Sequence, residues 1–217
     1  HNDNNIEKGS FLSLECINND SPTNLSKAKA YLKHYESFDN NILLLDSSKM
    51  FLDRCDIHES FPFYIQYYYL KKEYIKCVKF SDYINLDEYC NIFTDNVLGL
   101  TNFRIGDSYR ELNLLDKSYE YFKKSLDFSP LNLEYLLKTA VIEIELSKFE
   151  ISKNRLKMII NLNPNYTRAH YNLGLIYLNE FKDTINAKIC FEKVKQLNPD
   201  YYLNNDIKNL INISNEK

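Results

Sequence analysis

Apolar residues recur along most of the chain at the three- and four-residue spacing of amphipathic helices. The pattern is clearest near the C-terminus, where TRAHYNLGLIYLNEF and INAKICFEKVKQL are joined by the short polar turn KDT. Similar pairs of apolar-periodic segments precede this one. The pattern predicts an all-α protein built from helix–turn–helix pairs.

Three prolines divide these pairs at a nearly constant interval. Pro130, Pro164 and Pro199 are separated by 34 and 35 residues, and each follows the second segment of a pair. Because proline cannot continue a helix, each is expected to end one unit and begin the next. A fixed period of this length is typical of repeat proteins, in which each unit packs on its neighbours.

The order of small, bulky and aromatic residues within each unit resembles the tetratricopeptide repeat (TPR) family, whose unit is a 34-residue helix–turn–helix. The family pattern places a small residue and then an aromatic in the first helix, and a small residue, an aromatic and a closing proline in the second. The last unit matches it with Leu173, Gly174, Tyr177, Ala187, Phe191, Val194 and Pro199, and the first with Ile105, Gly106, Tyr109, Ser118, Phe122, Ser125 and Pro130. The middle unit is looser, with Thr139, Ala140, Glu143, Ser152, Leu156, Ile159 and Pro164.

Glycine inside a helix costs roughly 1 kcal/mol relative to alanine. We therefore expect that close packing explains the glycine at position 174. Gly106, Ala140 and Gly174 recur at the repeat interval, opposite Ser118, Ser152 and Ala187. The resemblance implies close approach of the two helices at these points. Glu143 stands where the family has an aromatic, so either the packing there is weaker or a partner fills the gap.

The resemblance implies a superhelical stack (α-solenoid) with three repeats over residues 99–132, 133–166 and 167–199. A capping helix and tail are expected over 200–217. Residues 1–98 have helical patterns without a clean repeat frame, and we expect diverged helix pairs there, with a helix start at SPTN (residues 21–24). The tyrosine-rich stretch from Phe61 to Tyr74 is interpreted as core, because its acidic neighbourhood lacks the basic groove that nucleic-acid stacking requires.

Composition removes several functional classes. The 217 residues are 44% apolar and carry a net charge of −3, which indicates a folded protein without the field that attracts nucleic acid. No run approaches the roughly 18 apolar residues of a membrane span. The chain begins with His1, which indicates that a tag, signal sequence or lipid-anchored leader has been removed. A removed leader would place the protein in the periplasm or cell envelope, whereas a removed tag would leave a cytoplasmic location open.

The sequence contains no pattern that indicates catalysis. Its five cysteines form no CxxC pair, its four histidines form no metal-binding spacing, and its four glycines build no phosphate-binding loop. His170 lies in a repeat helix and is interpreted as a half-buried structural residue. We therefore expect no enzyme activity, no cofactor and no metal.

The TPR resemblance implies a partner-binding groove lined by the first helix of each repeat. Apolar groove positions would form a strip whose partner is an amphipathic helix or apolar strand, with Arg104, Lys138 and Arg168 receiving its acidic groups. The alternative is that the protein's own N-terminal helices fill the groove. The expected groove residues are Phe103, Arg104, Leu137, Lys138, Val141, Ile144, Arg168, Tyr171, Asn172, Leu175 and Leu178.

Chaperone-binding members of the family use a carboxylate clamp of basic and asparagine side chains. The corresponding positions here are Phe103, Asp107, Lys138, Arg168 and Asn172, of which only Arg168 is compatible, so a chaperone-tail-binding co-chaperone is disfavoured. The sequence favours a non-catalytic adapter or scaffold that binds another protein and supports the assembly or stability of a complex. The alternative is a repeat module of a larger enzyme or regulatory protein.

Overall fold

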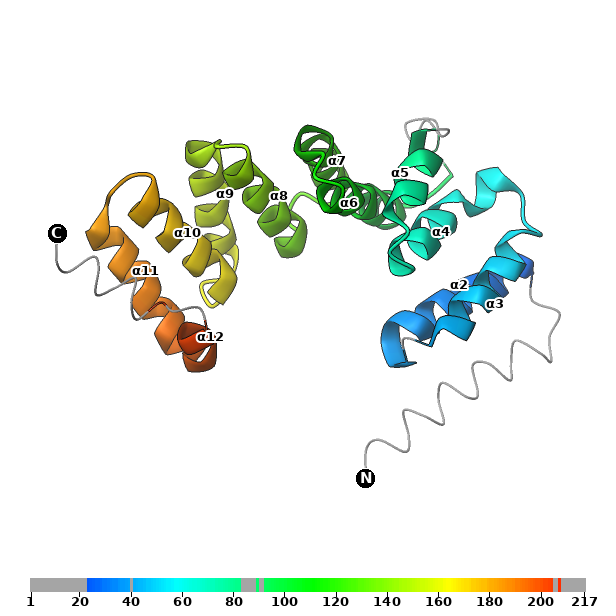
Figure 1. Cartoon of the computed structure of the whole chain (residues 1–217), viewed down its shortest axis with the longest axis horizontal. Helices are drawn as coiled ribbons and strands as arrows, with labels where there is room; N and C mark the ends of the chain where they lie inside the picture. The colour runs from blue at the N-terminus through cyan, green and yellow to red at the C-terminus, as the bar shows by residue number, and fades with distance from the viewer. Residues whose placement is uncertain (1–22, 40, 83–88, 90–91, 205–206, 208–217) are drawn as a thin grey trace, which may run out of the picture. The chain divides into compact units, whose positions relative to one another are not determined.

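The structure, a computed structural model, describes residues 23–39, 41–82, 89, 92–204 and 207. The chain forms two compact units that divide between Asn113 and Leu114. Both units are helical, and the described ranges contain no strand (Figure 1). The expectation of an all-α protein built from helix pairs is confirmed.

Among the described residues, the first unit contains two N-terminal helix pairs and one further helix. Helix α2 packs on α3, α4 packs on α5, and α6 packs on both α4 and α5. The elements are α2 (Asn24–His34), a π-helical turn (Tyr35–Asp39), α3 (Ile42–Leu52), α4 (Ile57–Leu70), α5 (Tyr74–Asp82) and α6 (Asp95–Glu111). The hydroxyl of Thr23 accepts a hydrogen bond from the backbone N–H of Ser26 at 3.2 Å, so α2 begins at the expected place.

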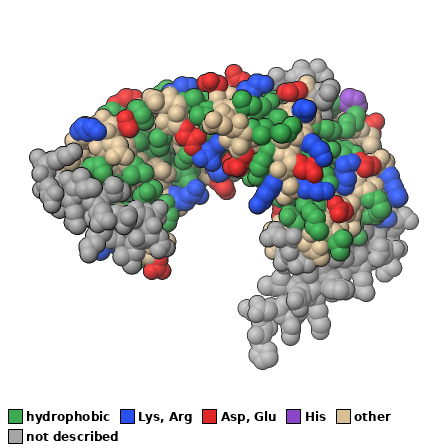
Figure 2. Space-filling view, viewed as in Figure 1, with side chains coloured by type: hydrophobic (Ala, Val, Ile, Leu, Met, Phe, Trp, Pro, Cys, Tyr) green, Lys and Arg blue, Asp and Glu red, His purple; other side chains and the backbone are tan. Residues whose placement is uncertain are grey.

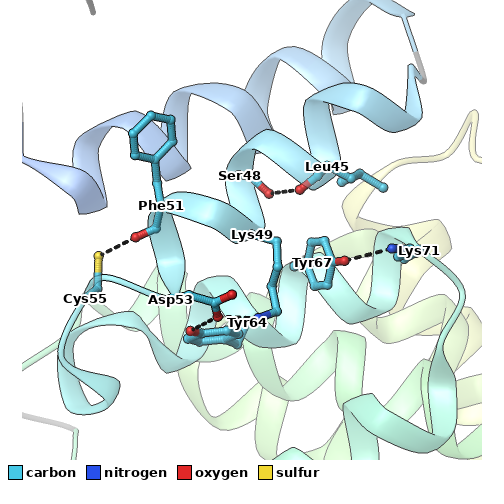
Figure 3. A network of polar contacts seen from close by, with 9 residues as sticks. All are labelled: Leu45, Ser48, Lys49, Phe51, Asp53, Cys55, Tyr64, Tyr67 and Lys71. Atoms are coloured by element: carbon cyan, nitrogen blue, oxygen red, sulfur yellow. Dashed lines mark hydrogen bonds and ion pairs between the residues drawn. The ribbon is translucent and has the colours of Figure 1, made fainter.

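The tyrosine-rich stretch of α4 forms core, as predicted. Phe61, Ile65 and Tyr67 are buried. Where tyrosines reach the edge of the core, their hydroxyls form hydrogen bonds with the charged residues that directly follow α3 and α4 (Figure 3). The Tyr64 hydroxyl donates to the Asp53 carboxylate at 2.8 Å, and Lys71 donates to the Tyr67 hydroxyl at 2.9 Å. The aromatic rings therefore serve packing, and their polar ends are satisfied at the rim.

The second unit is a run of helix pairs with the expected period. Its elements are α7 (Leu115–Phe128), α8 (Leu133–Glu145), α9 (Phe149–Leu162), α10 (Thr167–Asn179), α11 (Thr184–Leu197) and α12 (Pro199–Asn204). Pairs α8–α9 and α10–α11 pack internally, and α10 also packs on α9 (Figure 1). Pro130, Pro164 and Pro199 each lie two residues beyond the end of a helix, where proline stops the helix as predicted.

Four of the described turns between consecutive helices contain a residue in the left-handed region. These residues are Lys72 between α4 and α5, Asn113 between α6 and α7, Ser147 between α8 and α9, and Lys182 between α10 and α11, with φ of 55° to 59°. The last three follow the repeat period. None is glycine, so each turn holds a side chain in a conformation that L-residues rarely adopt.

Small residues allow close packing within the repeats. Gly106, Ala140 and Gly174 are all buried. A Cβ atom built on Gly174 would lie 2.6 Å from Cε1 of Phe191, so the aromatic ring of α11 occupies the space that a side chain would need. In the middle repeat, the Ser152 hydroxyl donates to the Ala140 carbonyl oxygen at 2.8 Å, which joins the two helices. The direct contact of Gly174 is thus the ring of Phe191 rather than Ala187.

Glu143 leaves no gap for a partner, because the protein's own Arg155 pairs with it. Its side chain is fully buried and accepts two hydrogen bonds from the guanidinium of Arg155 on α9, at 2.9 and 2.7 Å. A bidentate pair of this geometry fills the volume that an aromatic would take and satisfies the buried carboxylate. Burial, with the Glu143 charge beside it, raises the pKa of Tyr119 on α7.

The C-terminal end of the second unit is capped. Ile207 is fully buried in a cluster with Ala187, Phe191 and Val194. The ring of Tyr201 on α12 meets that of Tyr171 edge-on, with centroids 5.4 Å apart. These residues cover the apolar side of the last helix pair, as expected of a capping helix. The rest of the expected tail, residues 208–217, lies outside the described residues.

Candidate partner-binding groove

A cavity of about 220 Å³ opens between α8 and α10, the first helices of two successive repeats. Four expected groove residues line it, namely Val141, Ile144, Asn172 and Leu175. Each of the four is partly exposed. The two helices therefore bring these side chains to one accessible site.

The cavity has an apolar floor and a polar rim. Val141, Ile144 and Leu175 provide apolar surface, while Glu145 and Glu180 are exposed at the edge. The amide nitrogen of Asn172 donates to the Arg168 carbonyl oxygen at 2.9 Å, and this bond fixes the orientation of the amide. An apolar side chain fits the floor, and the carboxylates at the rim favour a cation beside it.

Not every expected groove residue lies at this site. Leu137 is fully buried in the core with Leu136 and Ala140, so it is not part of an exposed strip. Tyr171 and Leu178 pack against the C-terminal cluster around Phe191. Lys138 and Arg168 are at least partly exposed but do not line the cavity.

The expected residues on α6 belong to the first unit, where the protein's own helices cover them. Phe103 and Arg104 are buried. The guanidinium of Arg104 pairs with Glu36, in the π-helical turn after α2, at 2.5 Å. Arg104 is therefore not a rim cation awaiting a partner, and for this part of the strip the self-filled alternative is correct.

The position that a carboxylate clamp would use on α6 is also engaged internally. Asp107 is buried and accepts a hydrogen bond from the Tyr69 hydroxyl at 2.9 Å. Phe103, the other clamp position on α6, is buried as well.

Four cavity residues lie outside the set of expected groove residues, namely Glu145, Ile176, Asn179 and Glu180. Ile176 and Glu180 lie one helical turn apart at the end of α10. Glu180 follows the last residue of the helix, so a repeat template that stops inside the helix misses it. Its four-residue spacing from Ile176 is the signal that places both on one face.

Titratable residues elsewhere have structural roles. His170 is buried rather than half-buried, and its Nε2 lies 2.9 Å from the Pro164 carbonyl oxygen, to which it donates. Burial raises the pKa of the Cys77 and Cys190 thiols to about 11, so both are protonated and unreactive at neutral pH. Cys16 and Cys90 lie outside the described residues. Within the described residues, no group of three or more His, Cys, Asp or Glu side chains is placed to hold a metal ion.

Comparison with known proteins identifies the repeats. The sequence profile of the tetratricopeptide repeat family matches residues 101–130 and 167–201. The chain carries tetratricopeptide repeats. The middle repeat, where Glu143 and Arg155 replace the usual aromatic packing, lies between the two matched segments. No curated protein matches the sequence.

Solved TPR structures share the fold at low sequence identity. YrrB, a TPR protein with an unusual peptide-binding site, gives a TM-score of 0.64 at 13% identity over 90% of this chain and 97% of its own. The first TPR of Spaghetti (RPAP3), bound to the HSP90 peptide SRMEEVD, gives 0.52 at 22% identity over 58% and 99%. MamA from Desulfovibrio magneticus RS-1 gives 0.57 at 15% identity over 75% and 91%. At these identities the similarity establishes the TPR fold alone.

The surface and helix lengths add two observations. On the face seen in Figure 2, acidic and basic side chains are interspersed and form no single-sign stripe. Among the helices that the structure describes, none combines the length and apolarity that crossing a bilayer requires.

Proposed function

We propose that the TPR repeats of the second unit form a non-catalytic docking site for a segment of another protein, at the groove between α8 and α10. The observation that carries the proposal is the accessible apolar cavity of about 220 Å³ on the first helices of two consecutive repeats. Such a cavity holds one anchoring side chain, and adjacent contacts along α8 and α10 would extend the interface.

The chemistry of the rim defines the segment further. An apolar anchor such as leucine would lie on Val141, Ile144 and Leu175, with a lysine or arginine of the partner near Glu180. The sequence predicted a partner with acidic groups. The cations expected to receive those groups do not line the cavity. The amide of Asn172 is suited to hydrogen bonding with the partner backbone.

The test uses the purified chain and a displayed library of random peptides. Selected peptides should contain an apolar residue next to Lys or Arg, and their Kd should rise at least about tenfold on replacing both Val141 and Leu175 with glutamate. Both residues are partly exposed, so the fold should tolerate the change. Calorimetric melting of the variant checks that it does.

Ile185 offers the matched control. It is 74% exposed on α11 and lies outside the groove, so Ile185→Glu adds charge to the same unit without entering the site. It should leave peptide affinity unchanged. Equal binding by the wild type, the groove variant and the control would exclude the α8–α10 site.

Within this proposal, the protein acts as an adapter or scaffold that holds a partner in a complex. A cell-envelope location stays a prediction from the sequence, and fractionation of the producing cell with an antibody against the chain tests it. Catalysis forms no part of the proposed mechanism, since the groove residues supply binding surface rather than an activated nucleophile or acid–base pair.

A further inference from the structure

A second cavity lies on another face of the second unit, between the second helices of two successive repeats. Its volume is about 550 Å³, within the range of small-ligand pockets and larger than the groove cavity. Helices α9 and α11 form its walls, and both pack on α10, whose residues form its floor. The cavity is thus bounded on three sides by secondary structure.

The floor is apolar and rigid. Leu173 and His170 of α10 are buried there, and Cys190 of α11 lies beside them. The hydrogen bond from His170 to the Pro164 carbonyl fixes the ring, because the carbonyl can only accept and Nε2 must carry the proton. Ile160 and Ile189 extend the apolar surface up the two walls.

The walls carry two cations from different helices. Lys157 lies on α9 and Lys193 on α11, and both line the cavity. Among the described residues neither forms an ion pair, although carboxylates neutralise other lysines of the unit, such as Lys153 with Glu150. Glu192 is the one acidic side chain that the described lining contains, so the mouth has a net positive charge.

We propose that the cleft between α9 and α11 binds a small organic carboxylate with an apolar body. The apolar body would lie on Leu173, Ile160 and Ile189, and the carboxylate would lie between the ammonium groups of Lys157 and Lys193. A neutral apolar compound would leave both lysines without a counter-charge, and a cation would be repelled. The volume of about 550 Å³ suits a small molecule, whereas a protein surface would need roughly 800 Å² on each partner.

The probe is 4-phenylbutyrate, with 4-phenylbutyramide as its uncharged counterpart. Methyl-labelled protein is titrated with each and followed by NMR, because isoleucine methyl groups report on both sites: Ile160 and Ile189 for the cleft and Ile144 for the groove. The acid should shift the Ile160 and Ile189 signals and leave that of Ile144 in place. The amide should bind about tenfold more weakly.

Charge variants test the lysines directly. The double variant Lys157→Gln/Lys193→Gln should lower affinity for the acid about tenfold and leave that for the amide unchanged. Lys157→Arg/Lys193→Arg should retain acid binding. Lys195→Gln is the matched control, since Lys195 lies on α11 outside the cavity lining. An unchanged methyl spectrum of each free variant shows that its fold is intact.

The proposal is overturned by equal binding of acid and amide, by shifts at Ile144 alone, or by no shift with either probe. A blocked peptide, acetyl-Gly-Leu-Glu-Gly-amide, that shifts Ile160 and Ile189 at lower concentration than the free acid would overturn it in favour of a protein ligand. The cleft and the groove are independent, so the Val141→Glu/Leu175→Glu variant should bind the acid normally. Failure at one site therefore leaves the other unaffected.

Discussion

Gly174 shows how a missing side chain sets the spacing of a helix pair. The Phe191 ring lies where the Cβ of any other residue would stand, and that ring is itself almost fully buried. The ring has little room to move. Close packing of the two helices therefore offsets the low helix propensity of glycine.

Replacing Gly174 with alanine should therefore destabilise the protein, although alanine is the better helix former. Overpacking costs about 1–3 kcal/mol, and the gain in propensity is about 1 kcal/mol, so we expect a net loss of roughly 1 kcal/mol in urea unfolding. In a Phe191→Leu background the same change should become neutral or stabilising, because the contact at 2.6 Å is gone. Identical effects in both backgrounds would contradict the packing explanation.

The buried pair of Glu143 and Arg155 gives a second prediction for single residues. Arg155→Met leaves a fully buried carboxylate without its partner and should lower the free energy of unfolding by about 3 kcal/mol. The double variant Glu143→Met/Arg155→Met removes the charge as well and should recover most of that loss. Chemical denaturation of the four proteins in this cycle measures the coupling. A double variant no more stable than Arg155→Met would show that the loss comes from packing instead of charge.

Single residues also mark the limit of what the sequence predicts. The small residues and prolines were identified because they recur at the repeat interval. The partner of Glu143 was not identified, because the repeat pattern does not indicate that Arg155, twelve residues later on the next helix, forms a hydrogen bond with it. The contact between Arg104 and Glu36 spans 68 positions, and it removed Arg104 from the expected groove rim. Periodicity predicts local faces, whereas burial depends on which distant helix covers them.

At the level of helices, the sequence predicted the helix pairs, but α6 begins at Asp95, four residues before the expected start of the first repeat. Helices α8 and α10 begin at Leu133 and Thr167, the positions where the second and third repeats were expected to begin. The turns inside the pairs were less visible. Four of the described turns contain a left-handed residue, yet the residues used are lysine, asparagine and serine rather than the glycine that would reveal such a turn.

These turns provide a stabilising substitution. Ser147 is exposed with φ of 58°, and a left-handed conformation costs an L-residue roughly 1–2 kcal/mol. Glycine removes that strain but loses about 0.5–1 kcal/mol through its freedom in the unfolded chain, so Ser147→Gly should gain roughly 0.5 kcal/mol. Thermal melting measures the gain. Ser147→Ala, which keeps the Cβ atom, should give none, and an equal rise in Tm for both variants would refute the argument from strain.

For the whole molecule, repeats make stability local. Within the second unit each helix pair packs on its neighbours in sequence, so the end of the array depends on whatever covers its last apolar face. Here Tyr201 and Ile207 provide that cover for Phe191 and Val194. The same reasoning explains why α11 can carry the cleft residues Ile189 and Lys193 on one side while its other side remains core.

Weakening the cap should therefore loosen the chain unevenly. Tyr201→Ala/Ile207→Asp places a charge at a fully buried position and should raise amide exchange throughout α10 and α11, while protection of α2 to α5 in the first unit stays unchanged. Asp200→Ala, on the exposed side of α12, is the control and should leave exchange unaffected. Hydrogen–deuterium exchange resolved by mass spectrometry separates the two units. A uniform increase along the chain would mean that both units unfold as one cooperative body, because a local loss of packing energy can spread only through strong coupling between units.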